Sequence, residues 1–107
     1  MINKETTRVS DVLPVIDFHP DLPKKPLAEI LDKECLISDI KVIRNFQSEF
    51  GESDFALLLL RDLVTGEYFT TLCGGMVVVK KCQYLLDNAL LPIKGMITFA
   101  GKYYDLN

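Results

Sequence analysis

The chain contains one histidine, His19, and it lies between two aspartates in the stretch Asp17-Phe-His-Pro-Asp21. An aspartate near a histidine can take part in proton transfer, and the carboxylates of Asp17 and Asp21 are of the ligand type that hard cations prefer. However, the sequence pairs no serine or cysteine nucleophile with this histidine, and prolines surround it. We therefore expect a solvated loop histidine, no catalytic residues and no enzymatic activity.

The three cysteines offer little material for metal or redox chemistry. Cys35, Cys73 and Cys82 are odd in number and lack a C-x-x-C spacing, which argues against a disulfide framework and against a metal knuckle. We expect them to be small buried residues in a reducing compartment, the cytoplasm. The pair Gly74-Gly75 is not followed by G-K-[ST] and is therefore not a phosphate loop. Neither a metal nor any other cofactor is expected.

Aromatic and basic residues are interleaved along the second half of the chain. An outward ring on a strand is a platform on which a base can stack, worth about 1–3 kcal/mol per base, and nearby cations can bind phosphate. Adjacent residues of a strand point to opposite faces, so one ring of each adjacent aromatic pair is expected to face outward. The candidate nucleic-acid-binding residues are Arg44, Phe46, Phe50, Arg61, Tyr68, Phe69, Lys94, Lys102, Tyr103 and Tyr104. The alternative is that most rings belong to the core and most lysines are only solvated.

Short strands must position these residues, and the hydrophobic pattern predicts strands from residue 34 onward. The alternation in the first strand slips at Ser38-Asp39, which indicates a bulge or bend. The continuous apolar run at 55–60 is typical of a strand buried on both faces. The predicted elements are a strand at 34–46, a loop at 47–54, a hairpin of strands at 55–61 and 67–73, an amphipathic helix carrying Val78, Cys82, Leu85 and Ala89, a strand at 93–99, a turn at 100–102 and a last strand at 103–106.

The predicted order is three strands, one helix and two strands, with no βαβ alternation. This is the element order of the OB-fold, a partly open five-stranded Greek-key barrel that binds oligonucleotides or oligosaccharides. The alternative is a small meander sheet with one covering helix. The length of 107 residues fits one domain. Four of the five prolines fall between residues 14 and 26, so we expect a proline-rich arm at 1–26 and a mainly β, OB-fold-like domain at 27–107.

Charge and hydropathy narrow the classes of function. Twelve basic and fifteen acidic residues leave a formal net charge of −3, which argues against nucleic-acid binding by bulk charge but leaves a local basic patch open. No apolar run approaches the roughly 18 residues of a membrane span, and the first ten residues are polar and charged. Neither a membrane segment nor a signal peptide is therefore expected.

Three stretches carry a family resemblance: EYFTTLCGG at 67–75, the valine-rich helix start, and GKYYDL at 101–106. They resemble small single-stranded-DNA-binding-like proteins of phages and prophages, over about residues 27–107. The resemblance implies an OB-fold that binds single-stranded DNA without sequence preference in replication or recombination. The partners it implies are single-stranded DNA or alternatively RNA, further copies of the chain, and replication or recombination proteins, in the host cytoplasm if a phage encodes the chain.

A second class of function fits the same barrel. The acidic balance, the apolar hairpin and the proline-rich arm are also typical of a protein–protein interaction or assembly subunit. A strand-binding face predicts affinity that falls steeply with salt, whereas an oligomer interface predicts a particle larger than the monomer. A small enzyme is the least expected class, because the sequence lacks paired carboxylates, a nucleophile–base pair and a metal set.

Overall fold

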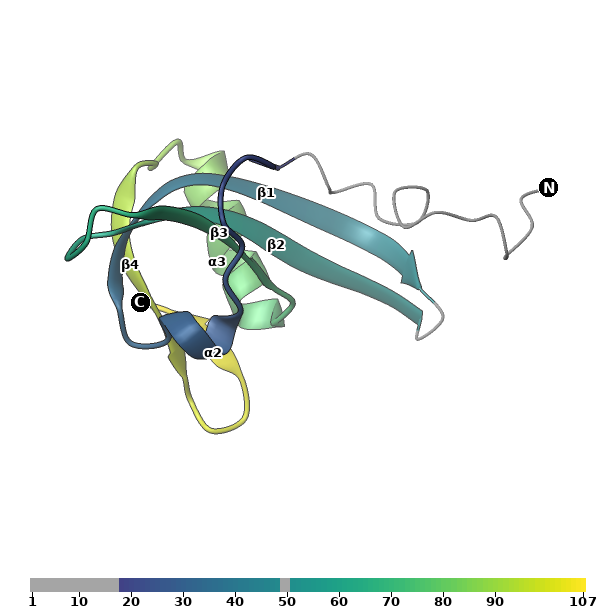
Figure 1. The fold of residues 1–107 in the computed structure, drawn as a ribbon. Coiled ribbons are helices and arrows are strands. Elements are labelled where there is room, and N and C mark those ends of the chain that lie inside the picture. The colour runs from purple at the N-terminus through teal and green to yellow at the C-terminus, as the bar shows by residue number, and fades with distance from the viewer. Residues whose placement is uncertain (1–17, 49–50) are drawn as a thin grey trace, which may run out of the picture.

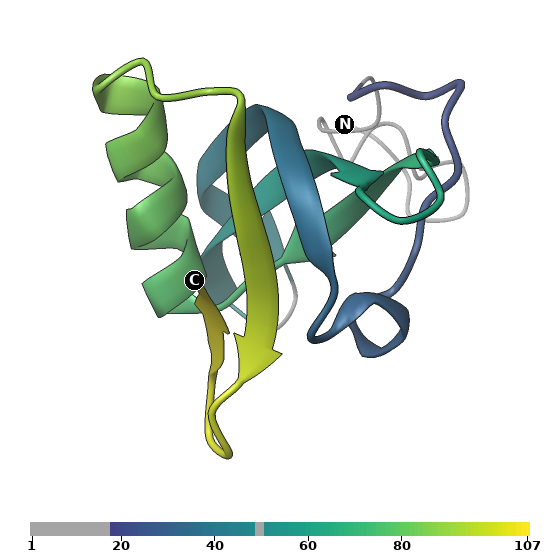
Figure 2. The ribbon, with the colours of Figure 1, turned by 90° about the vertical axis from the view of Figure 1, so that its left-hand side faces the viewer.

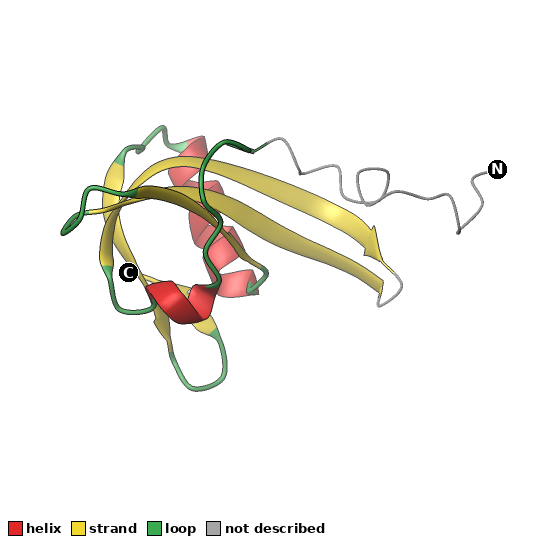
Figure 3. Ribbon diagram, in the orientation of Figure 1, coloured by secondary structure: helices red, strands yellow, loops and turns green. Residues whose placement is uncertain are grey.

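The structure is a computed structural model that describes residues 18–48 and 51–107, and it is mainly β. Five antiparallel strands form one sheet in the order β3-β2-β1-β4-β5, and a helix lies between the third and fourth strands (Figures 1 and 3). The predicted order of strands and helix is confirmed. The elements are α2 (Leu27–Ile30), β1 (Glu34–Ser48), β2 (Gly51–Asp62), β3 (Tyr68–Cys73), α3 (Met76–Asp87), β4 (Ile93–Phe99) and β5 (Tyr104–Leu106).

The sheet curls strongly (Figure 2). It is open rather than a closed barrel, because β3 and β5 are not paired with each other. Within the described ranges, β3 and β5 are the two edges of the sheet. One reason is that β5 has only three residues. The other is that the segment before α2 occupies the edge of β3, where the Thr70 N–H donates to the Pro23 carbonyl at 2.8 Å and the Lys25 N–H donates to the Thr70 carbonyl at 2.9 Å.

The inner face of the curled sheet packs against α3 and forms the main core. Leu58 pairs with Thr71 and Leu60 pairs with Phe69, so alternate residues of β2 and β3 point inward. The helix contributes three fully buried side chains, Val78, Val79 and Cys82. The predicted inward face is confirmed at Val78 and Cys82, and Leu85 packs partly buried against the same core. The prediction is wrong at Ala89, because α3 ends at Asp87 and Ala89 is exposed, with a φ of +52°.

The strands β1 and β2 form a long hairpin that projects beyond the rest of the sheet (Figure 1). The register shifts between Ile37 and Asp39, which confirms the bend predicted there. The predicted loop at 47–54 is wrong, because strand pairing continues to Ser48 and Gly51. Polar residues at an exposed hairpin end pair as strands because the backbone bonds, rather than side-chain burial, hold that end together.

A second register shift lies just before Phe46, where Asn45 has a φ of +57°. The backbone N–H of Asn45 donates to Asp54 Oδ1 at 2.8 Å, and Arg44 donates to Asp54 Oδ2 at 3.1 Å. These bonds lower the pKa of Asp54 below its usual value, and the bond from the Asn45 backbone has the larger effect. The kink leaves Phe46 edge-to-face with the ring of Phe55.

The turn between β2 and β3 is held by Asp62. Its Oδ1 accepts the backbone N–H groups of Val64 at 2.8 Å and Thr65 at 3.2 Å. These two bonds lower the pKa of Asp62, because they favour the charged carboxylate. Gly66 closes the turn with a φ of +77°, a conformation that glycine adopts without a steric cost. The predicted hairpin of 55–61 and 67–73 is therefore confirmed.

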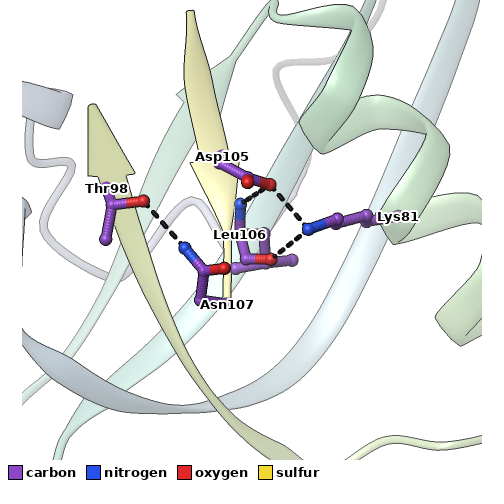
Figure 4. A network of polar contacts seen from close by, with 5 residues as sticks. All are labelled: Lys81, Thr98, Asp105, Leu106 and Asn107. Atoms are coloured by element: carbon purple, nitrogen blue, oxygen red, sulfur yellow. Dashed lines mark hydrogen bonds and ion pairs between the residues drawn. The ribbon is translucent and has the colours of Figure 1, made fainter. Parts of the chain in front are cut away.

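A polar network fastens β5 to α3 (Figure 4). Lys81 Nζ donates to Asp105 Oδ1 at 2.7 Å and to the Leu106 carbonyl at 2.9 Å, and the Asn107 side chain donates to Thr98 Oγ1 at 2.8 Å. The Lys81 ammonium lowers the pKa of Asp105. Lys81 is therefore engaged in fastening the last strand, and its charge is already partnered.

Candidate nucleic-acid interface

The face of β1, β2 and β3 that points away from α3, called the outer face below, collects several of the candidate residues. Antiparallel partners share a face, so the register assigns each side chain to one side of the sheet. Successive rows of residues cross the outer face from β1 through β2 to β3. These rows are Leu36–Arg61–Tyr68, Asp39–Leu59–Thr70 and Lys41–Leu57–Leu72, followed by the pair Ile43–Phe55 of β1 and β2.

The first of these rows combines cations with an exposed ring. Lys94 of β4 pairs with Leu36 and extends the row by one strand. Tyr68 is 43% exposed, and the Arg61 guanidinium lies 5.6 Å from the centre of the Tyr68 ring. Neither Arg61 nor Lys94 forms an ion pair with a described residue. Neighbouring strands lie about 4.8 Å apart, so the row spans about 14 Å from Lys94 to Tyr68.

A groove of about 660 Å³ lies on the same face, lined by the long hairpin, β3 and the segment before α2. Its lining includes Phe46, Phe55, Leu57 and Leu72. The rings of Phe46 and Phe55 lie 5.4 Å apart, and half of Leu72 is exposed. Lys24 also lines the groove and has no ion pair among the described residues. The groove thus offers aromatic and aliphatic surface with a cation at its side.

Residues 18–25, called the strap below, run across the outer face of the sheet (Figures 1 and 2), and Phe18, Lys24 and Lys25 of the strap line one side of the groove. The strap follows the row Asp39–Leu59–Thr70. At β1, His19 Nε2 lies 2.8 Å from Asp39 Oδ2, and at β3 the strap makes the backbone bonds to Thr70 described above. Phe18 is buried in a cluster with Phe55, Leu57 and Leu59. His19, expected to be solvated, is half-buried and bonded to Asp39.

The candidate residues near the C-terminus lie apart from the outer face, on the hairpin of β4 and β5. Lys102 and Tyr103 are exposed in its turn. Tyr104 is half-buried, and its ring centre lies 5.1 Å from that of Phe99, which is 52% exposed. Figure 1 shows this hairpin extending away from the long hairpin of β1 and β2. It is therefore a second aromatic surface rather than part of the outer face.

Two further candidates, Phe69 and Arg44, make contacts within the protein, one in the core and one in an ion pair. Phe69 is 1% exposed and points into the core, so it cannot stack on a base, and Tyr68 is the outward member of this pair. Arg44 is exposed but bonded to Asp54, and its other nitrogen lies 3.5 Å from Gln83 Oε1. Phe50 lies outside the described residues.

Sequence reasoning missed several residues that line this face. The residues absent from the predicted nucleic-acid-binding set are Lys24, Lys41, Phe55, Leu57 and Leu72. The sequence holds a signal for three of them, because alternate residues of a strand share a face. Phe55 and Leu57 alternate with Arg61 along β2, and Leu72 alternates with Tyr68 along β3. The run at 55–60 does bury both faces, as predicted: Leu58 and Leu60 lie in the main core, and Leu57 and Leu59 lie beneath the strap.

The buried thiols offer no reactive group. All three cysteines are buried and unpaired, and burial raises the pKa of Cys82 to about 12. Among residues 18–48 and 51–107, no three His, Cys, Asp or Glu side chains are grouped so that they could hold a metal ion. Neither helix in the described part of the chain has the length and apolar character needed to cross a membrane.

Comparison of the chain with protein-family models, with curated proteins and with solved structures finds no match.

Proposed function

We propose that this chain binds single-stranded nucleic acid, DNA foremost, on the outer face of β1, β2 and β3, without catalysis and without sequence preference. The observation that carries the proposal is the row of Arg61, Tyr68 and Lys94, which presents an exposed ring and two cations that form no ion pair with a described residue. The adjoining groove adds the rings of Phe46 and Phe55. Stacking rings beside a cationic surface are the recurring device of proteins that bind single strands.

We further propose that the fold is a member of the OB-fold class, opened between its third and fifth strands. In support, β1 pairs with both β2 and β4, and the helix follows β3. OB-folds bind oligonucleotides over their second and third strands, which is where the row and the groove lie. The resemblance to phage and prophage single-stranded-DNA-binding-like proteins fits this proposal, with a role in replication or recombination in the cytoplasm.

The proposed mechanism depends on local charge, because the whole chain is acidic, with a formal net charge of −3. Four cations on or beside the outer face have no ion pair with a described residue: Lys41 of β1, Arg61 of β2, Lys94 of β4 and Lys24 of the strap. The carboxylate of Asp39, by contrast, is bonded to His19. Phosphates would bind to these cations and release counterions. Bases would stack on Tyr68 and on the groove, and any base has a π-face, so little sequence preference follows.

A second candidate function is assembly with another protein or another copy of the chain, through the hairpin of β4 and β5. Phe99 and Tyr103 are both exposed there, away from the outer face. Clustered exposed rings are typical of protein interfaces. Sedimentation of the full chain with and without oligonucleotide separates the two functions, because only assembly yields a larger particle in the absence of nucleic acid.

An NMR titration of the isotopically labelled chain with an oligo-dT of about 20 nucleotides tests the proposed location. We expect amide shifts to change most in β2 and β3, around Arg61, Tyr68 and Leu72, where bases and phosphates would lie. The exposed face of α3, around Tyr84, is the internal control and should change least. Changes confined to α3 or to the hairpin of β4 and β5 would contradict this interface.

A further inference from the structure

The strap divides the proposed binding face into two parts. It runs along the row Asp39–Leu59–Thr70, with the row of Arg61 on one side and the row of Leu57 on the other. Figure 2 shows this segment on the side of the sheet opposite to α3. A nucleic-acid strand that followed β2 from Arg61 to Phe55 would therefore meet the strap in the middle of its path.

The strap is fastened at its two ends by contacts of different kinds, side-chain contacts at one end and hydrogen bonds of its backbone at the other. Near β1 it is held by the contact between His19 and Asp39, both half-exposed, and by the ring of Phe18. Near β3 it is held by backbone bonds to Thr70 and by the Thr71 hydroxyl, which donates to the Lys25 carbonyl at 2.8 Å. The main core lies on the other face of the sheet and includes neither Phe18 nor His19. The β1 end can therefore leave the sheet without opening the main core.

We propose that the strap is a displaceable cover of the outer face, hinged at its attachment to β3, and that long single strands bind only after its β1 end lifts. This inference rests on the proposed function. With the strap closed, a short strand still reaches Arg61, Tyr68 and Lys94 on one side. A long strand needs the open state, so its apparent affinity is reduced by the fraction of molecules in which the strap is open.

A tether between the strap and β1 tests this cover directly. The double variant His19→Cys, Asp39→Cys places two thiols at the β1 end of the strap, where a short bis-maleimide can join them. The native cysteines are buried and their pKa values are raised, so only the introduced thiols should react. The matched control is the same variant blocked with N-ethylmaleimide, which lacks the His19–Asp39 contact equally but leaves the strap untethered.

The two forms are compared by titrating labelled oligo-dT of about 5 and about 20 nucleotides at low salt. We expect the long oligo-dT to bind the blocked form about tenfold more tightly than the tethered form, and the short one to bind both alike. Phe18→Ala, which removes the buried ring of the strap, should raise affinity for the long probe several-fold without a tether. Tyr84→Ala, an exposed ring on α3, is its control and should change nothing.

Equal affinity of the tethered and blocked forms for the long oligo-dT would contradict the proposal that the strap is a displaceable cover. The proposed function would remain intact. Equal weakening of both probes by the tether would also overturn it, because the tether would then disturb the Arg61 row itself. Failure of both probes to bind either form would contradict the proposed function, and with it the proposal that the strap covers the binding face.

Discussion

Replacing Phe69 by alanine should lower the free energy of unfolding by about 3–5 kcal/mol, the cost of emptying a core site that held a phenyl ring. Phe69 is 1% exposed and packs in the main core opposite Leu60. Its neighbour Tyr68 lies on the other face and is 43% exposed. Tyr68→Ala should therefore change stability by no more than about 1 kcal/mol. Urea unfolding of the two variants and the parent chain measures both values.

This pair of variants tests the register on which the binding face depends. A shift of one residue in the pairing of β2 and β3 would exchange the faces of the two rings. In that case Tyr68→Ala would be the damaging change and Phe69→Ala the mild one. Equal losses from both would mean that the two faces of β3 are buried to the same degree, which contradicts an exposed aromatic row.

Tyr68→Ala should weaken binding of oligo-dT by about 5- to 140-fold, although it leaves the fold nearly as stable. The reason is the loss of one stacking platform, worth about 1–3 kcal/mol, at about 1.4 kcal/mol per tenfold in affinity. Arg61→Ala removes a phosphate contact and the cation beside the ring, which lies 5.6 Å away. It should weaken binding and also reduce the salt slope by about 0.7. Fluorescence anisotropy at several salt concentrations measures both quantities.

The control for these variants is Tyr84→Ala, because Tyr84 is 62% exposed on α3, away from the outer face. Its loss should leave oligo-dT affinity unchanged. Equal weakening by Tyr84→Ala and Tyr68→Ala would show that stacking is not confined to the outer face. An unchanged salt slope in Arg61→Ala would show that this guanidinium does not touch phosphate.

The strand order was predictable because each strand carries its own pattern of turns and alternation. The hairpin of β2 and β3 follows from the run at 55–60, the Thr65-Gly66 turn and the aromatic–threonine strand after it. The bend at Ser38-Asp39 was visible as a break in the alternation. By contrast, the hairpin pairing beyond Phe46 was not predictable, because polar residues carry no hydrophobic alternation there.

The division of the candidate residues between two surfaces could not be predicted from the sequence. Parity shows which residues of one strand share a face. Only the register across strands shows that Lys94 lies in the same row as Arg61, with Leu36 between them. The strap was also not predicted, because the lead-in carries prolines and no periodic pattern. Its position depends on contacts between residues far apart in sequence, such as His19 and Asp39, which are 20 residues apart.

The most direct test of the central claim is the affinity of the full chain for a labelled oligo-dT of about 30 nucleotides, measured by fluorescence anisotropy at low salt and again near 200 mM salt. We expect binding at low salt that weakens as salt rises, because the contacts of Lys41, Arg61 and Lys94 with phosphate would release counterions. No binding at micromolar protein in low salt would contradict single-strand binding, and assembly through the hairpin of β4 and β5 would then be the function to pursue.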